Sequence, residues 1–216
     1  TGYIHFLRGY AYYHILMTCG PAILVGDEIF ESNLEGPAYN TYRATYDETV
    51  EYICSELETA AAYLPLKASI AQFERPTKGA AYALIARLRL HAASPLFNGT
   101  STARLYFGNW KRTYDKEYYV NQNYSEEKWA LAAAACKRVI DMNVYELFTV
   151  SKDQNTPQLP AGVPTENFPD GAGGIDPFKS YSYMFTGDEP FKNNNEIIWG
   201  RISEEVKGYT QQSFPQ

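Results

Sequence analysis

The segment from Thr77 to Ser94 constrains the fold more than any other part of the sequence. Its pattern predicts a helix that carries alanines on nearly every face, with leucines between them: Ala80, Ala81, Ala83, Ala86, Ala92 and Ala93, and Leu84, Leu88 and Leu90. Small side chains on several faces let neighbouring helices approach closely. The sequence therefore predicts a helix in the middle of a helical layer, ended by Ser94-Pro95.

Three further helices are predicted around this one. The first covers residues 3–18 and stops at Gly20-Pro21. The second begins at Thr45 with a capping box, in which the Thr45 hydroxyl accepts the Glu48 amide proton and the Glu48 carboxylate accepts from the Thr45 amide. Pro65 ends this second helix.

The fourth predicted helix is capped by Ser125 and continues to about Asp141. Its apolar stripe consists of Trp129, Ala132, Ala133, Cys136, Val139 and Ile140. The spacing Trp129-x2-Ala132-Ala133-x2-Cys136 follows the first helix of a tetratricopeptide repeat with smaller residues, although no regular 34-residue period is present. The sequence therefore indicates helical hairpins packed side by side.

The expected fold is mostly α, with tetratricopeptide-like helical hairpins and a loop-rich subdomain containing little β. Residues 1–145 are assigned to the helical region, which includes a long aromatic loop at about 96–124. Residues 146–216 are assigned to the loop-rich part of a second subdomain, incomplete at the C-terminus, because residues 150–216 hold 7 of the 12 prolines and 7 of the 15 glycines. One strand is expected at 196–202, with Trp199 in the core. Since neither end looks like that of a whole protein, the chain is expected to be a middle piece of a longer one.

Charge and composition exclude several classes of function. Nineteen basic against 25 acidic residues give a net charge of −6, which argues against nucleic-acid binding. The sequence has no apolar run long enough for a membrane helix and no targeting signal. The three cysteines are far apart and form neither a disulfide framework nor a zinc motif.

Catalytic and metal-binding motifs are also missing from the sequence. The three histidines are expected to be packed and hydrogen-bonded, and the adjacent acidic pairs, which a glycosidase would need near one bond, are expected to be solvated: Asp27-Glu28, Asp188-Glu189 and Glu204-Glu205. The segment Asp170–Asp176 either forms a flexible turn or wraps a calcium ion, but it lacks the alternating oxygens of an EF-hand. No catalytic residue, cofactor or metal is therefore assigned.

Aromatic residues supply the candidate binding site. The loop at 96–124 interleaves tyrosines and a tryptophan with Asn, Arg and Lys, and the chosen ligand-binding candidates there are Tyr106, Trp110, Tyr114 and Tyr118. Tyr181 and Tyr183 alternate along a second predicted loop and are added as candidates. Flat rings stack on the apolar faces of sugars while polar groups bond the hydroxyls, although the same residues suit a protein interface or the packing of the loop on itself.

Five collinear segments carry a resemblance to a known family. They are Phe6–Tyr13, Arg43–Glu48, Glu74–Gly99 (ERPTKGAAYALIARLRLHAASPLFNG), Trp129–Ala134 and Asn195–Trp199. In this order they resemble SusD/RagB-like proteins, the nutrient-binding lipoproteins of Bacteroidetes outer membranes. Glu74 and Pro76 depart from the family's usual residues without weakening the resemblance.

The resemblance implies a role in polysaccharide utilization and nutrient uptake. A family member captures glycan at the cell surface and hands it to a SusC-like TonB-dependent outer-membrane transporter, and members are not enzymes. They are held in the membrane by a lipidated N-terminal cysteine, which would lie outside this segment. Two alternatives are a peptide-binding member of the same family and a tetratricopeptide-like adaptor that binds a protein segment. Binding residues vary between members, so the aromatic candidates rest on loop chemistry alone.

Overall fold

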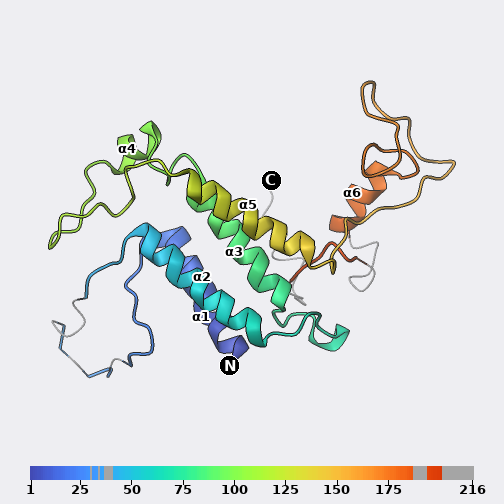
Figure 1. The fold of residues 1–216 in the computed structure, drawn as a ribbon. Coiled ribbons are helices and arrows are strands. Elements are labelled where there is room, and N and C mark those ends of the chain that lie inside the picture. The colour runs from blue at the N-terminus through green and yellow to red at the C-terminus, as the bar shows by residue number, and fades with distance from the viewer. Residues whose placement is uncertain (30, 34, 37–40, 187–193, 201–216) are drawn as a thin grey trace, which may run out of the picture.

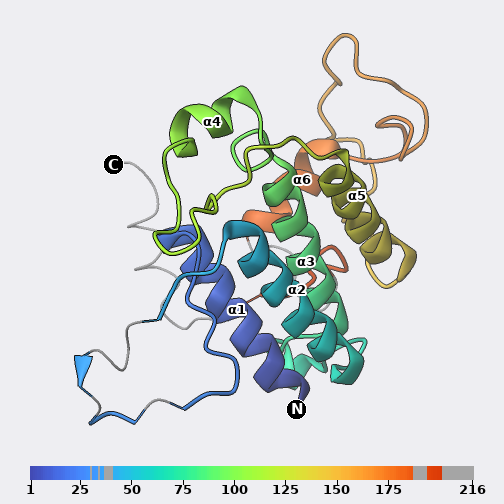
Figure 2. The same ribbon diagram turned by 60° about the vertical axis from the view of Figure 1, so that its left-hand side comes forward.

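Four long helices form a single layer in the computed structural model, which describes residues 1–29, 31–33, 35–36, 41–186 and 194–200. They are α1 (Gly2–Cys19), α2 (Tyr46–Tyr63), α3 (Lys78–Ala93) and α5 (Glu126–Asp141). Each packs on the next along the chain, so that α3 lies between α2 and α5 (Figures 1 and 2). The prediction of a mostly helical fold with α3 in the middle of a layer is confirmed.

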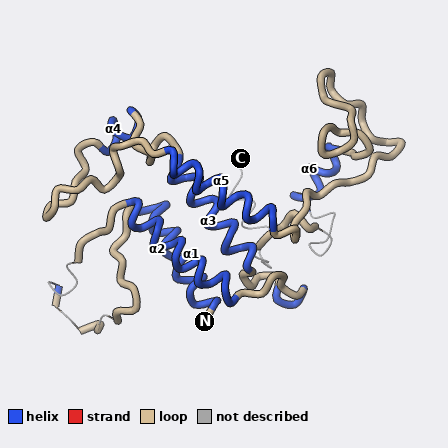
Figure 3. The backbone as a smooth tube through the Cα atoms, viewed as in Figure 1, coloured by secondary structure: helices blue, strands red, loops and turns tan. Residues whose placement is uncertain are grey.

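The direction of the helices decides where the connections lie. Successive helices of the layer run in opposite directions (Figure 1). The connection 20–45, between α1 and α2, and the connection 94–125, between α3 and α5, therefore meet at one end of the layer, which we call the loop end. The connection 64–77 and the chain after α5 leave from the opposite end, as the tan segments of Figure 3 show.

The core lies between α1, α2 and α3. Its largest fully buried side chains come from all three helices and from the segment after α4: Phe6, Tyr46, Val50, Ile53, Leu57, Leu88 and Val120. The small residues of α3, such as Ala81 and Ala93, are almost completely buried and allow α2 and α5 to pack on opposite sides of it.

Side-chain caps begin two of these helices, and the one at α2 was expected. At α2 the Glu48 amide donates to Thr45 Oγ1 at 3.1 Å and the Thr45 amide donates to Glu48 Oε2 at 2.6 Å, so the capping box is confirmed. At α3 the Ala80 amide donates to the Thr77 hydroxyl at 3.2 Å. Ser125 stands at the start of α5, but its side chain makes no capping bond, contrary to expectation.

Short helices lie inside segments that the sequence assigned to loops. They are η2 (Ile70–Gln72), α4 (Ser101–Phe107) and α6 (Pro177–Thr186). Tyr181 and Tyr183 therefore belong to a helix, and their predicted loop is wrong. Asp176 holds the start of α6, because its carboxylate accepts from the Lys179 amide at 2.9 Å. Its own carbonyl accepts from the Ser180 amide.

The strand predicted at 196–202 is wrong for its described part, residues 196–200, which form turns and bends; Arg201 and Ile202 lie outside the described residues. Trp199 instead packs on α1, with its ring edge-to-face against Phe6 and Tyr10, and its indole N–H donates to the Glu74 carbonyl at 2.8 Å. Its expected place beside the core is confirmed. Within the described residues, β pairing is limited to three isolated bridges.

The outer helix α5 leaves part of its predicted apolar stripe exposed to solvent. Ala132 is buried against α3, but Trp129 is 41% exposed and Ile140 is 72% exposed. Among the helices of the layer, α5 packs mainly on α3 and reaches α2 through the ion pairs Lys128–Asp47 and Arg138–Glu58, so one narrow face of α5 is covered in the described part of the chain.

Asn98 closes the 94–125 connection at its base. Its side chain is fully buried, and its amide group donates to the Ser125 carbonyl at 2.9 Å while its carbonyl oxygen accepts from the Ser125 amide at 2.9 Å. Gly99 follows with a φ of +58°, and a Cβ there would lie 2.1 Å from the Asn123 carbonyl carbon. Only glycine fits this close approach of the two chain segments.

We expect Gly99→Ala to lower the free energy of unfolding by at least ~2 kcal/mol, since the left-handed backbone costs about 1 kcal/mol or more and the Cβ also displaces the Asn123 backbone. Gly26→Ala is the matched control, because Gly26 has a φ of +64° and open space around it. It should cost only about 1 kcal/mol in the same denaturant titration. Equal effects of the two substitutions would contradict the tight closure at Gly99.

Candidate ligand-binding site

A ladder of aromatic rings runs through the inside of the 94–125 connection. The ring of Tyr46 stacks on Phe97 with centroids 4.3 Å apart, and Phe97 lies 5.8 Å from Phe107. Phe107 continues to Trp110 at 6.1 Å, and Trp110 to Tyr119 at 4.7 Å. These contacts tie α4 and the returning chain to the start of α2.

Trp110 is therefore a supporting residue within the ladder. Its side chain is half-buried and packs against the core, close to Gly20 at the end of α1. Of the other three candidates of this loop, Tyr106 and Tyr114 are exposed, whereas Tyr118 is half-buried like Trp110.

A buried arginine holds the tip of the 94–125 connection, by which we mean residues 111–118. The Arg112 guanidinium donates to Glu48 Oε2 at 3.0 Å and to Asp115 Oδ2 at 2.7 Å, and it also bonds the carboxylate of Glu117. The Arg112 side chain is only 7% exposed, while the three carboxylates are 34–58% exposed. One cation thus joins the tip to the capping box of α2.

This arrangement lowers the pKa of two of the carboxyl groups. The pKa of Glu48 lies below its usual value, first because the Thr45 amide donates to it and further because Arg112 is adjacent. Partial burial opposes the shift at Asp115, but the Glu117 amide and Arg112 still lower its pKa. Both groups are therefore ionised and held in ion pairs at neutral pH.

The tip presents a pair of exposed tyrosines. Tyr114 stacks on Tyr42 of the other connection with centroids 4.2 Å apart and planes inclined by 44°. The Arg112 guanidinium lies 5.2 Å from the Tyr114 ring on the inner side. Tyr42 is 62% exposed and Tyr114 51% exposed, so the pair offers an apolar surface that is held from below.

Tyr42 is absent from the candidates chosen from the sequence. It lies far from Tyr114 along the chain, and the only signal for it is indirect: antiparallel helices bring alternate connections to the same end.

The two remaining loop candidates lie near Tyr114 in sequence and differ in accessibility. Tyr118 is half-buried, and the Lys111 ammonium lies 4.2 Å from its ring centre. The backbones of Lys111 and Tyr118 form an antiparallel bridge. Tyr106 lies on α4 and is 69% exposed.

Tyr181 and Tyr183 do not join this site. Both lie on α6, and Figure 1 shows α6 at the opposite end of the layer from α4. The structure thus separates the six candidate residues into four at the loop end and two at the far end.

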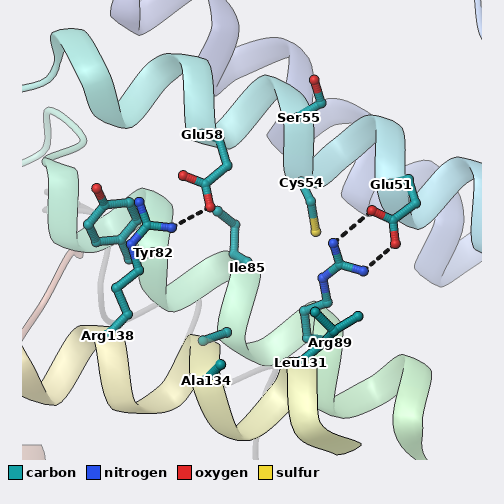
Figure 4. Close-up of a pocket in the computed structure, with 11 residues that line it drawn as sticks. Glu51, Cys54, Ser55, Glu58, Tyr82, Ile85, Arg89, Leu131, Ala134 and Arg138 are labelled. Atoms are coloured by element: carbon teal, nitrogen blue, oxygen red, sulfur yellow. Dashed lines mark hydrogen bonds and ion pairs between the residues drawn. The ribbon is translucent and has the colours of Figure 1, made fainter. Parts of the chain in front are cut away.

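A groove that the sequence did not predict lies between α2 and α5, with α3 as its floor (Figure 4). Its volume is about 350 Å³. Arg89 reaches across to Glu51, with one bond of 2.8 Å, and Arg138 pairs with Glu58 while its guanidinium covers the Tyr82 ring at 3.8 Å (Figure 4).

A larger hollow of about 620 Å³ lies between α1, α3 and residues 198–200. Tyr10, Tyr13, His14 and Trp199 form its aromatic wall and Arg87 supplies a charge. Tyr10 and Trp199 are also packed against Phe6, so part of this wall belongs to the core.

The described residues contain no candidate metal site. No three His, Cys, Asp or Glu side chains among them gather as metal ligands. Asp176, which the sequence offered for calcium, uses its carboxylate to accept from the Lys179 amide and from Thr156 Oγ1 at 2.9 Å. Burial raises the pKa of the Cys54 thiol to about 12, so this cysteine is a protonated core residue at neutral pH.

Two of the three histidines have the expected packed, hydrogen-bonded roles, whereas His14 is exposed on α1 with its ring against Tyr10 and Tyr13, contrary to expectation. His91 bonds the Tyr46 hydroxyl at 2.8 Å and His5 bonds Glu56 at 2.7 Å. Asp27 is exposed and pairs with Arg8. The pairs Asp188-Glu189 and Glu204-Glu205 lie outside the described residues. Within those residues, no helix has the length and apolar character needed to cross a membrane.

Comparison with known proteins identifies the fold. A family model described as "Starch-binding associating with outer membrane", of the SusD-like type, matches residues 1–90. The solved structure of BT4246 is 27% identical with a TM-score of 0.69, covering 94% of this chain and 34% of that one. A SusD-like protein of Bacteroides fragilis is 22% identical with a TM-score of 0.56, covering 97% of this chain and 28% of its own, and shows the fold alone.

The chain thus spans about a third of the length of these solved structures. Comparison with curated proteins gave no match. The family match to α1, α2 and most of α3, together with the shared tetratricopeptide-like helical fold, supports the resemblance of this chain to SusD/RagB-like proteins.

Proposed function

We propose that the protein binds carbohydrate at the cell surface through its loop end. The single observation that carries this is the exposed Tyr42–Tyr114 pair, whose rings come from two connections and stack 4.2 Å apart. Sugar rings have apolar C–H faces that pack on such aromatic surfaces, while nearby polar groups bond their hydroxyls. Because Arg112 and the aromatic ladder already hold this surface in place, little ordering would oppose binding.

Binding without bond cleavage fits the charges at this end. Glycoside hydrolysis generally uses two carboxyl groups on either side of the bond, one of them a general acid with a raised pKa. Glu48 and Asp115 instead have lowered pKa values and are held by Arg112. We therefore assign capture, not hydrolysis, to this surface.

We further propose that the bound oligosaccharide passes to a SusC-like TonB-dependent transporter in the outer membrane. The family description, starch-binding and associated with the outer membrane, supports both the ligand class and the place. A lipid anchor outside the present segment would provide the membrane attachment.

Peptide capture is the alternative ligand within the same role, and the groove between α2 and α5 is the observation that favours a protein ligand. Its lining contains Ile85 of α3 and Leu131 of α5, and its rim carries two ion pairs. A bound peptide or partner segment would protect this groove and leave Tyr42 and Tyr114 unchanged.

Removing either tyrosine of the pair tests the proposed surface. We expect Tyr42→Ala and Tyr114→Ala each to weaken polysaccharide binding by roughly tenfold, about 1.4 kcal/mol, as measured by calorimetry. Both rings are exposed, so helical circular dichroism should stay unchanged. Tyr63→Ala, an equally exposed tyrosine at the end of α2, is the control and should bind normally.

Loss of binding on Tyr181→Ala, with normal binding by the Tyr42 and Tyr114 variants, would move the site to the α6 end and contradict this assignment.

Arg112→Gln tests whether the arginine holds the tip. We expect it to lower the free energy of unfolding by about 1–2 kcal/mol, less than the ~3–5 kcal/mol of a fully buried pair, because its carboxylate partners remain partly hydrated. Arg138→Gln is the control, since that guanidinium and Glu58 are both over 40% exposed and should contribute about 1 kcal/mol or less.

The pH dependence gives a second measurement on the same variant. A carboxyl group whose pKa is lowered in the folded state stabilises the protein at pH values above its usual pKa, which is 4.5 for Glu48 and 3.8 for Asp115. This stabilisation is lost as the pH falls through the lower pKa of the folded state. The unmodified protein should therefore lose stability below about pH 4.5 more steeply than Arg112→Gln. Identical acid profiles would contradict the role of Arg112.

A further inference from the structure

The loop end differs in charge from the rest of the chain. Residues 96–124 hold four basic residues and two acidic ones, a net charge of +2, in a chain whose total is −6. The two acidic residues, Asp115 and Glu117, both pair with Arg112. The local positive charge therefore comes from the three cations that remain: Arg104, Lys111 and Lys116.

These three cations are held by groups other than carboxylates. Arg104 donates to the Gln122 carbonyl at 3.2 Å, and Lys116 donates to the Thr113 carbonyl at 2.7 Å. The Lys111 ammonium lies 4.2 Å from the centre of the Tyr118 ring. In the described part of the chain none of the three forms an ion pair, and all three residues are exposed. Each thus keeps its full charge available to a ligand.

Their positions follow the exposed tyrosines. Lys111 and Lys116 flank Tyr114 on the tip, and Arg104 lies on α4 two residues before Tyr106. Arg43, beside Tyr42 on the other connection, is also exposed and donates to the Cys19 carbonyl at 3.1 Å. Lys111 and Lys116 thus lie on either side of Tyr114 in sequence, Arg43 follows Tyr42, and Arg104 lies on α4 at the same end of the layer.

Among the acidic residues of the neighbouring segments, Glu48 lies at this end, where it pairs with Arg112, and the others lie elsewhere. In the 20–45 connection they fall between Asp27 and Glu35, and that part of the chain turns away from the tip in Figures 1 and 2. Glu126 and Glu127 belong to the first turn of α5, at the base of the loop and not at its tip. Asp47 pairs with Lys128. Five basic residues at the loop end, Arg43, Arg104, Lys111, Arg112 and Lys116, therefore face the three carboxylates that pair with Arg112, which leaves a net charge of +2.

We propose that the glycan bound at this surface is anionic, a polysaccharide bearing uronate or sulfate groups whose charge is met by Lys111, Lys116 and Arg104. This inference rests on the proposed function, because it names the class of carbohydrate for the same site. Hydrogen bonds between a cation and a carboxylate or sulfate are roughly twice as strong as neutral ones, and charge attraction also speeds encounter. Tyr42 and Tyr114 would supply sugar contact and the cations would select the charged polymer.

Polygalacturonate and its fully methyl-esterified form give a matched pair of probes that differ in charge. In calorimetry at 50 mM salt, the protein should bind polygalacturonate at least tenfold more tightly, and the difference should shrink at 500 mM salt because exposed charges are screened. Dextran sulfate against dextran repeats the comparison with sulfate groups. Polyglutamate, an anionic polymer without sugar, should bind weakly.

The charge variants sharpen the test. Lys111→Gln combined with Lys116→Gln should reduce binding of the anionic polymers about tenfold and leave binding of the neutral ones unchanged. Lys67→Gln combined with Lys152→Gln removes two exposed lysines that lie away from the loop end, and should bind like the unmodified protein.

Equal affinity for charged and esterified polymers would overturn the anionic assignment while leaving carbohydrate binding in place. Equal affinity for polyglutamate would also overturn it, by showing a basic patch that does not select sugar. Binding of none of the polysaccharides would instead remove the proposed function itself.

Discussion

The buried side chain of Asn98 is the interaction on which the candidate site depends. Its amide group bonds both the amide and the carbonyl of Ser125, so the two ends of a connection about thirty residues long are fixed to each other beside the core. A buried amide that lost these partners would leave polar groups unsatisfied, which is costly. Closure at the base lets the rest of the connection be arranged by contacts within itself and with α2.

Those further contacts divide the aromatic residues into two roles. The inner rings, from Tyr46 through Phe97 and Phe107 to Trp110, fill the inside of the connection and give it a small core of its own. The outer rings of Tyr42 and Tyr114 remain in solvent, with Arg112 beneath one of them. A surface built in this way presents apolar area without collapsing on itself, as a rigid binding site requires.

Much of the fold could be predicted from local patterns. The capping box at Thr45, the alanines around α3 and the terminating Ser94-Pro95 depend on neighbours along the chain, and the structure confirms the helices they define. Residues 196–200 fail as a strand because Trp199 packs on Phe6 and Tyr10 of α1, contacts that no local pattern reveals. The exposed part of α5 follows from its position at the edge of the layer, where it packs mainly on α3, and periodicity does not determine that position.

The candidate site could be predicted only in part for the same reason. Composition pointed to the aromatic loop, but it did not separate the half-buried Trp110 from the exposed Tyr114. It also grouped Tyr181 and Tyr183 with them, although α6 lies at the other end of the layer. Tyr42 could be recognised as a site residue only from the directions of the helices, because their antiparallel packing brings the 20–45 connection to Tyr114.

Amide hydrogen exchange along the chain, with and without a bound polysaccharide, tests the central claim most directly. The account predicts that ligand slows exchange at residues 41–45 and 104–118, where the two connections meet, and leaves α6 and the groove between α2 and α5 unchanged. Protection confined to α6, or to the facing surfaces of α2 and α5, with no change at the loop end, would contradict it.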